Sequence, residues 1–180
     1  SGAAVKYVKL PAALTVMGGS CFNGCPNLNE MEFPATLKEI PYYTCINTPV
    51  FAKVTLHNGL EKIGEAAFAR SFGENSQNMM TELTIPETVK EIGNAAFVGT
   101  RIKTLTIPAS VTTIGDKAFW HCPNLTEIHY GGTMEQWKQI HKGYEQTWKP
   151  DGTNWASDTG EFIVYCTDGQ LSKTEAHQTN

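Results

Sequence analysis

The chain has 180 residues, of which 41% are hydrophobic and 18% are charged, and its formal net charge is -4 at pH 7. This composition is typical of a soluble protein with a single buried core. Arg70 and Arg101 are the only arginines and no lysine cluster compensates, so the basic surface that nucleic-acid binding needs is missing. No apolar run approaches the roughly 20 residues that span a bilayer, and we expect no membrane insertion.

One pattern, apolar-x-x-apolar-x-apolar, recurs six times along the chain, and its middle position advances by 23, 23, 29, 22 and 23 residues. Such a period is the signature of a solenoid. We expect the last two apolar residues of each triple to point inward from a short strand, and the strands to stack into one continuous parallel sheet. The triples are Val5/Val8/Leu10, Leu28/Met31/Phe33, Phe51/Val54/Leu56, Met80/Leu83/Ile85, Ile102/Leu105/Ile107 and Leu125/Ile128/Tyr130.

Proline follows the strand in four of the six repeats. Because proline has no N–H group to give to a neighbouring strand, it ends the ladder there, and the strands should be short. A second apolar pair then lines the other wall of the core, followed by a glycine and by a small residue next to phenylalanine, which suits a tight helical turn. The second pairs are Leu14/Met17, Leu37/Ile40, Leu60/Ile63, Val89/Ile92 and Val111/Ile114.

The second repeat departs from this pattern at two positions. Pro41 stands where the other repeats carry glycine, so either this position never needs a positive φ or this rung bends differently. Cys45 replaces the repeat phenylalanine and leaves a volume that Tyr42, Tyr43 or Phe51 must fill,. The sequence alone leaves these alternatives open.

The repeated clause, in LTIPETVKEIGNAAF (83–97), together with FNGCPNL (22–28) and FWHCPNL (119–125), resembles the BspA-type leucine-rich repeat proteins. Such proteins are found mostly on bacterial and protozoan cell surfaces. The resemblance covers about residues 5–169 and implies a right-handed leucine-rich repeat solenoid, with a parallel β-sheet on one face and turns and short helical turns on the other. It also implies an extracellular or cell-surface location. The opening residues SGAAVKYVKL contain no apolar signal-peptide region, so we expect that any export signal has been removed.

We divide the chain into a solenoid, residues 1–130, with repeats starting near residues 5, 28, 51, 80 and 102, and an α/β cap, residues 131–180, that belongs to the same domain. The long third step reflects a polar six-residue insertion within residues 69–80, which we place outside the solenoid,. The amino end shows no comparable cap, so upstream repeats or a further domain are expected to adjoin it.

The cap begins with Thr133 and Gln136, spaced as a capping box for a short helix whose Trp137 and Ile140 cover the core,. Residues 161–166, EFIVYC, read as a strand added to the end of the sheet. The tail 173–180 has no apolar pattern to hold it. The aromatic residues of the cap form a hydrophobic lid, or one or two of the tryptophans are exposed and stack on sugar rings or on a partner protein. Besides Trp137 the aromatic residues are Trp148, Trp155, Phe162 and Tyr165.

Stacking places equivalent residues about 4.8 Å apart, so outward-facing positions form ladders. We expect two such ladders on the exposed sheet face and interpret them as the ligand-binding surface, because solenoids commonly bind through such a face. The alternative is a solvated β surface in which threonine is simply a good strand former. The first ladder is Tyr7, Glu30, Lys53, Glu82, Thr104 and Glu127, and the second is Lys9, Glu32, Thr55, Thr84, Thr106 and His129.

Charged residues of opposite sign alternate on the second wall, both along and between repeats. We interpret them as structural pairs that fix the register of the rungs, since each exposed pair contributes only about 0.2 to 1 kcal/mol. The two rows are Lys38, Glu61 and Lys90, and Glu39, Lys62 and Glu91.

The five cysteines do not form a recognisable disulfide framework,. Cys25 and Cys122 share a repeat position but lie four rungs apart, about 19 Å, which is too far for a disulfide. Cys25 and Cys45, on adjacent rungs, remain a pair that we do not exclude. The spacing of Cys21 and Cys25 lacks the second ligand pair of a zinc site.

No catalytic arrangement is predicted. His121 precedes Cys122, but neighbours in sequence point apart, and catalysis by a nucleophile also needs an orienting third group. Residues 151–161, DGTNWASDTGE, lack the residue order of a calcium loop,. We therefore expect no enzyme, no metal and no cofactor.

These observations predict a monomeric, non-catalytic protein-binding module of a bacterial cell-surface or secreted protein, active in adhesion or host interaction. The expected partner is a host or matrix protein that docks on the exposed sheet face. Two alternatives remain: glycan binding through the aromatic cap, or a passive structural spacer within a larger surface protein.

Overall fold

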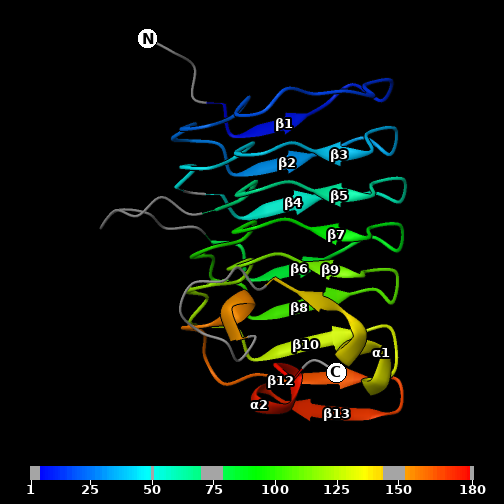
Figure 1. The fold of residues 1–180 in the computed structure, drawn as a ribbon. Helices are drawn as coiled ribbons and strands as arrows, with labels where there is room; N and C mark the ends of the chain where they lie inside the picture. The colour runs from blue at the N-terminus through cyan, green and yellow to red at the C-terminus, as the bar shows by residue number, and fades with distance from the viewer. Residues whose placement is uncertain (1–4, 50, 70–78, 144–152, 179–180) are drawn as a thin grey trace.

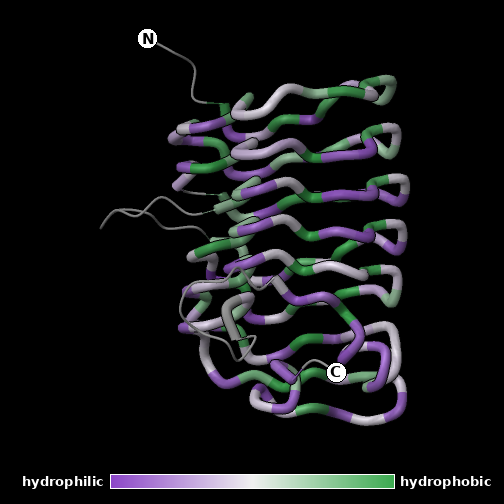
Figure 2. Tube along the Cα trace, viewed as in Figure 1, coloured by the Kyte–Doolittle hydropathy of each residue, from purple (hydrophilic) through white to green (hydrophobic). Residues whose placement is uncertain are grey.

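The computed structural model describes residues 5–49, 51–69, 79–143 and 153–178, which form a stack of similar turns with β1 at one end and β13 at the other (Figure 1). Hydrophobic residues recur at the same points of successive rungs and line up along the stack (Figure 2). One cluster of buried residues, from Leu28 to Ala176, runs through the repeats and the cap.

The first wall holds the six strands expected from the repeat pattern. They pair in parallel and in the expected register, since Val8 lies beside Met31 and Met31 beside Val54, while Leu83 lies beside Leu105 and Leu105 beside Ile128. The strands are β1 (Tyr7–Lys9), β2 (Glu30–Glu32), β4 (Lys53–Thr55), β6 (Glu82–Thr84), β8 (Thr104–Ile107) and β10 (Glu127–Tyr130).

The prediction of one continuous sheet on this wall is wrong at one junction. Strands β1, β2 and β4 form one sheet, whereas β6, β8 and β10 belong to another, and no ladder joins β4 to β6. Figure 1 shows a wider separation between β4 and β6 than between the paired strands on either side. The interruption falls where the repeat step lengthens to 29 residues.

The second wall is itself a parallel sheet of two-residue strands, which the paired apolar positions did not reveal. Its strands are β3 (Glu39–Ile40), β5 (Lys62–Ile63), β7 (Glu91–Ile92), β9 (Thr113–Ile114) and β11 (His141–Lys142). This sheet continues across the junction at which the first is broken, because β5 pairs with β7. The third and fourth repeats are therefore held together on one wall and apart on the other.

The third wall consists of tight turns, and in the described part of the repeats none of them lengthens into a helix. The turns bond across rungs: the Phe68 N–H donates to the Ala96 carbonyl at 2.9 Å, and the Phe97 N–H to the Ala118 carbonyl at 2.8 Å. Beneath them the rings of Phe68 and Phe97 stack with centroids 5.4 Å apart, and those of Phe97 and Phe119 with centroids 5.3 Å apart. Small residues beside phenylalanine thus permit a continuous aromatic stack.

The glycine that precedes these turns is needed for close approach rather than for backbone conformation. Gly64 and Gly93 do not have a positive φ, but a Cβ atom on Gly93 would lie 2.8 Å from the backbone carbon of Gly64. Of the two alternatives for Pro41, the structure supports the first, in which this position needs no positive φ. The preceding repeat carries glycine at the equivalent position, Gly18. An added Cβ on Gly18 would meet only the Cys21 sulfur, at 3.9 Å, so close approach does not require glycine there.

The volume left by Cys45 is filled from inside the core. Phe51 is buried and stacks on Phe68 with a centroid distance of 5.9 Å, and the Cys45 thiol lies 3.6 Å from the sulfur of Met31. Tyr42 and Tyr43 are exposed and do not contribute. All five cysteines are free thiols in the structure.

The cap covers the last rung with helix α1 (Met134–Gln139), the 3-10 helix η1 (Thr153–Ala156), strands β12 (Ile163–Cys166) and β13 (Gly169–Ser172), and helix α2 (Lys173–Ala176). The predicted capping box of Thr133 and Gln136 is present. β12 extends the first wall in parallel with β10, as expected, and β13 returns antiparallel to β12.

Burial decides between the two alternatives for the cap tryptophans and corrects the expectation for the tail. Trp137 and Trp155 are completely buried, so they form a lid and offer no platform to a sugar; Trp148 lies outside the described residues. The tail is held as far as His177, because Ser172 caps α2 and Ala176 is buried. The predicted insertion also falls mainly outside the described residues.

Candidate functional site

The exposed sheet face carries both predicted ladders, and each of the twelve residues is at least partly exposed. The register places Tyr7 beside Glu30 and Glu30 beside Lys53, and it places Thr84 beside Thr106 and Thr106 beside His129. Each ladder is interrupted between β4 and β6. The face therefore consists of an amino-side half and a carboxyl-side half of different chemistry.

The amino-side half is organised around the carboxylate of Glu32. The Lys9 ammonium lies 2.9 Å from it, the Tyr7 hydroxyl donates to it at 3.0 Å, and the His57 ring lies 3.5 Å away. Lys9 and Tyr7 hold the pKa of Glu32 below its usual value. Sequence reasoning missed His57, which lies where four other repeats carry proline; no repeat pattern could have connected it to Glu32.

The carboxyl-side half changes from threonine to aromatic chemistry along the stack. Thr84 and Thr106 lead to His129, whose ring stacks on Tyr165 with a centroid distance of 5.2 Å and an interplanar angle of 16°. Through β12 the two ladders continue to Ile163 and Tyr165, both exposed. The alternation in residues 161–166 was the signal that could have added these two residues to the predicted site.

A cleft of about 700 Å³ separates the two halves and is lined by residues 52–58 and 81–87. Val54 and Leu56, which should point into the core, are only partly buried here, whereas their equivalents Leu83 and Ile85 are buried. The cleft thus reaches from the exposed face down to the hydrophobic core.

The cleft is closed at both ends by hydrogen bonds between the third and fourth repeats. At one end the Met79 N–H donates to the Phe51 carbonyl at 2.8 Å. At the other, the Glu87 N–H donates to the Asn58 side chain at 3.1 Å, and the Thr88 hydroxyl receives a bond from the Gly59 N–H at 2.8 Å. The cleft is therefore bounded at each end by hydrogen bonds that join the third repeat to the fourth.

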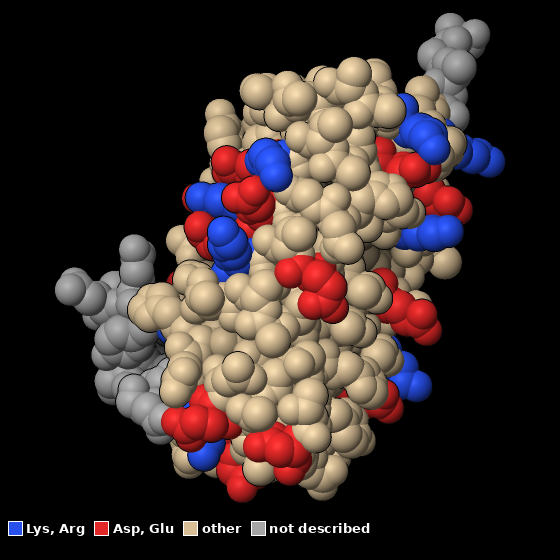
Figure 3. All heavy atoms as spheres, turned by 90° about the vertical axis from the view of Figure 1, so that its right-hand side faces the viewer, with Lys and Arg blue, Asp and Glu red and all other residues tan. Residues whose placement is uncertain are grey.

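The charge rows of the second wall form three of the predicted ion pairs, and Lys90 belongs to none among the described residues. Lys62 lies 3.1 Å from Glu91 and 3.9 Å from Glu39, and Lys38 lies 3.0 Å from Glu61. Figure 3 shows most acidic and basic side chains along the two edges of the view, with largely uncharged surface and a few acidic groups between them. Since the charges neutralise one another locally, this wall is a less suitable docking surface than the sheet face.

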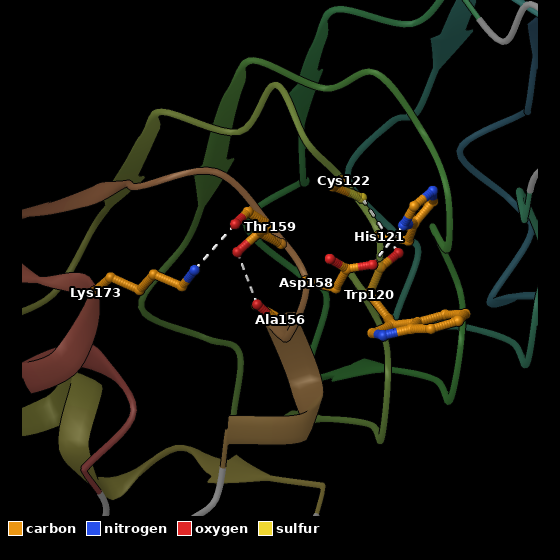
Figure 4. A network of polar contacts seen from close by, with 7 residues as sticks. All are labelled: Trp120, His121, Cys122, Ala156, Asp158, Thr159 and Lys173. Carbon is orange, nitrogen blue, oxygen red and sulfur yellow. Dashed lines mark hydrogen bonds and ion pairs between the residues drawn. The ribbon is translucent and has the colours of Figure 1, made fainter.

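The one histidine and cysteine that adjoin in the sequence point to different environments. The His121 ring meets the Asp158 carboxylate at 2.6 Å (Figure 4), while the Cys122 thiol is completely buried, and burial raises its pKa to about 11. A thiol in that state is a poor nucleophile. Over the described ranges no group of His, Cys, Asp and Glu has the arrangement of a metal site.

Within the same ranges, no helix combines the length and apolar character required to cross a membrane. The stack of short parallel strands with a repeat of about 23 residues defines the molecule as a leucine-rich repeat solenoid. A family model described as "BspA type Leucine rich repeat region" matches six copies over residues 1–126 and 71–141. The chain belongs to the BspA-type leucine-rich repeat family, as its sequence clause indicated.

Solved structures of bacterial proteins share this fold. A leucine-rich cell surface protein from Faecalibacterium prausnitzii is 25% identical with a TM-score of 0.70, over 78% of this chain and 36% of that one. A leucine-rich repeat protein from Eubacterium ventriosum is 25% identical with a TM-score of 0.59, over 69% and 32%. The T. pallidum leucine-rich repeat protein, 23% identical with a TM-score of 0.51, covers 70% of each chain.

The chain spans about a third of the length of the first two of these structures. No curated protein matches it.

Proposed function

We propose that the chain is a non-catalytic protein-binding module of a bacterial cell-surface or secreted protein and that its partner, a host or matrix protein, docks on the exposed sheet face. The single observation that carries this proposal is the pair of exposed ladders, each in register within the two parallel sheets of the first wall. Family membership and the likeness to a cell surface protein support the location.

The size and chemistry of the face suit a protein partner. Charged groups around Glu32 lie at one end, hydroxyl groups lie in the middle, and the aromatic pair of His129 and Tyr165 lies at the other end. A typical interface buries about 800 Å² per partner, which the two sheets of this wall, with seven parallel strands of three to four residues, can provide together. Tyr165 offers a rigid aromatic contact of the kind enriched at interface centres.

A binding screen against extracellular-matrix and host-surface proteins tests this proposal. We expect at least one partner whose affinity falls tenfold or more when Thr55, Thr84 and Thr106 are all replaced by lysine, because the substitutions add bulk and charge across the centre of the face.

The matched control replaces three threonines of the second wall, Thr15→Lys, Thr112→Lys and Thr113→Lys, and should leave binding unchanged. If the intact protein binds its partner equally well with either set of substitutions, the sheet face is not the docking surface. That result would favour a passive spacer.

A further inference from the structure

We propose that the cleft between β4 and β6 receives an extended peptide segment of the protein partner as an inserted β-strand. This inference deepens the proposed function and rests on it. An inserted strand is the occupant whose chemistry matches three independent features of the cleft.

The first feature is a set of backbone groups that lack the partners their equivalents have. The Lys53 N–H donates to the Asn29 carbonyl of the preceding repeat, and the Phe33 N–H donates to the Thr55 carbonyl. The backbone groups of Lys53 and Thr55 therefore face β2. Since backbone groups alternate in direction along a parallel strand, those of Val54 face the cleft.

The same reasoning applies to the other side of the cleft. The Lys103 and Thr104 N–H groups donate to the Thr81 carbonyl, and the Ile85 N–H donates to the Thr106 carbonyl. The backbone groups of Thr81 and Ile85, which flank β6, therefore face β8. The N–H and C=O groups of Glu82 and Thr84 therefore face β4, with which no ladder is formed. Another extended backbone would satisfy the donors and acceptors of both facing strand edges together.

The second feature is the partial exposure of the core beneath the gap. Val54 and Leu56 are only partly buried, like Val8 and Leu10 at the open end of the stack, although they lie in its middle. An inserted strand with apolar residues at alternate positions would cover both, while the residues between them would face solvent beside Thr55 and Thr84.

The third feature is charge. Lys53 and Glu82 are exposed at opposite rims of the cleft, and neither belongs to an ion pair among the described residues. In an unbroken ladder they would be neighbours. A polar residue on an inserted strand would lie between Lys53 and Glu82. The segment that fits therefore has apolar residues at every second position, to cover the core, and uncharged polar residues between them that can lie beside a lysine and a glutamate.

A suitable probe is the capped heptapeptide IKTLTIP, the sequence of residues 102–108, because its central residues already pair with β6 through the opposite edge of that strand. We expect the intact chain to bind this peptide and to bind a scrambled peptide at least tenfold more weakly. Methylation of alternate backbone nitrogens should also weaken binding at least tenfold, since it removes the donors without changing the side chains.

Amide hydrogen exchange supplies a readout on the protein itself. In the free chain the Val54 and Thr84 amides should exchange at least a hundredfold faster than those of Met31 and Thr106, which occupy equivalent positions in paired strands. Saturating peptide should slow exchange at Val54 and Thr84 and leave Met31 and Thr106 unchanged.

A matched pair of proline substitutions locates the binding. Val54→Pro removes an N–H that faces the cleft and should abolish peptide binding while the chain stays folded, as proline is tolerated at strand edges. Met31→Pro removes a bonded N–H at the same position of the neighbouring repeat and should lower thermal stability. If Val54→Pro fails to fold, the exchange measurement on the unaltered chain decides.

Several results would overturn the inference: no binding of the heptapeptide at millimolar concentration, equal binding by Val54→Pro, or slow exchange at Val54 and Thr84 in the free chain. Concentration-dependent dimers that compete with the peptide would show that a second copy is the occupant. Failure of the proposed function looks different, because then the peptide binds but no protein in the screen depends on the sheet face. A partner that binds the face yet tolerates Val54→Pro would leave the proposed function standing and remove only this inference.

Discussion

At the scale of single residues, the buried side chain of Lys142 stands out. It is 2% exposed, its ammonium donates to the Trp137 carbonyl at 2.7 Å, and it lies 5.0 Å from the centroid of the Trp137 ring. Burial lowers the pKa of Lys142 from 10.5 to about 8. A single carbonyl and a ring face thus compensate only in part for the lost hydration of the charge.

Lys142 should make stability rise with pH. Between pH 8 and pH 10.5 the unfolded chain holds a proton on Lys142 that the folded chain has lost, so unfolding takes up a proton and becomes less favourable as pH rises,. Below pH 8 the full cost remains, about 3 kcal/mol at 1.36 kcal/mol per pKa unit. We expect Lys142→Met to raise the melting temperature at pH 7. The variant should also lose the increase in stability between pH 8 and pH 10.5. Calorimetry checks both, with Lys138→Met as the control. An unchanged pH profile would contradict this account.

Gly93 provides a second residue-scale prediction. A Cβ atom there would lie 2.8 Å from backbone atoms of the preceding rung. Gly93→Ala must therefore push two rungs apart and should lower the free energy of unfolding by about 1 to 3 kcal/mol, as measured with denaturant. Gly18→Ala is the matched control at the same repeat position, where an added Cβ meets only a sulfur at 3.9 Å. Equal effects of the two substitutions would mean that close stacking is not the reason for glycine.

At the scale of elements, the second sheet depends on its charge rows for register. Each of its strands is only two residues long, and the Lys62 side chain of β5 pairs with Glu39 of β3 and Glu91 of β7. Lys62→Glu replaces two attractions by two repulsions between adjacent strands. We expect a loss of about 1 kcal/mol in the free energy of unfolding at low salt.

Salt is the discriminating variable for this prediction. At 1 M salt the Debye length falls to about 3 Å, so most of the loss should disappear. Lys103→Glu, at an exposed lysine that forms no ion pair among the described residues, should change stability little at either salt concentration. A salt-independent effect of Lys62→Glu would indicate altered packing instead of altered charge.

At the scale of the whole molecule, the repeat pattern predicted the stack because translation copies one set of contacts along the chain. The inward positions of β2, β8 and β10, the two exposed ladders and the α1 capping box follow directly from the spacing of apolar and polar residues. The interruption could not be predicted in this way, because Val54 and Leu56 satisfy the same pattern as buried residues elsewhere. The pattern predicts the features that all repeats share, but it does not predict how closely two particular repeats pack.

Other features were missed for more local reasons. Two-residue strands such as β7 carry too little alternation to be recognised. The β12–β13 hairpin turns at Thr167 and Asp168, because Gly169 already pairs with Cys166. It therefore lacks the central Asp-Gly pair that marks a two-residue turn, and the polar residues after it suggested a loose tail. Here tertiary packing of Leu171 and Ala176 against the cap decides the structure.

The position of the tryptophans has a spectroscopic consequence. All four lie at or beyond residue 120, and Trp137 and Trp155 pack against each other with centroids 5.8 Å apart. Their fluorescence therefore monitors one end of the array, whereas far-ultraviolet circular dichroism averages over every rung. Linear arrays melt in segments where the coupling between neighbours is weak. The junction of the third and fourth repeats lacks one of its sheet ladders and is the expected place for such weak coupling. Urea titrations followed by fluorescence and by circular dichroism should then have different midpoints. Coincident curves would mean that the array unfolds as one cooperative unit.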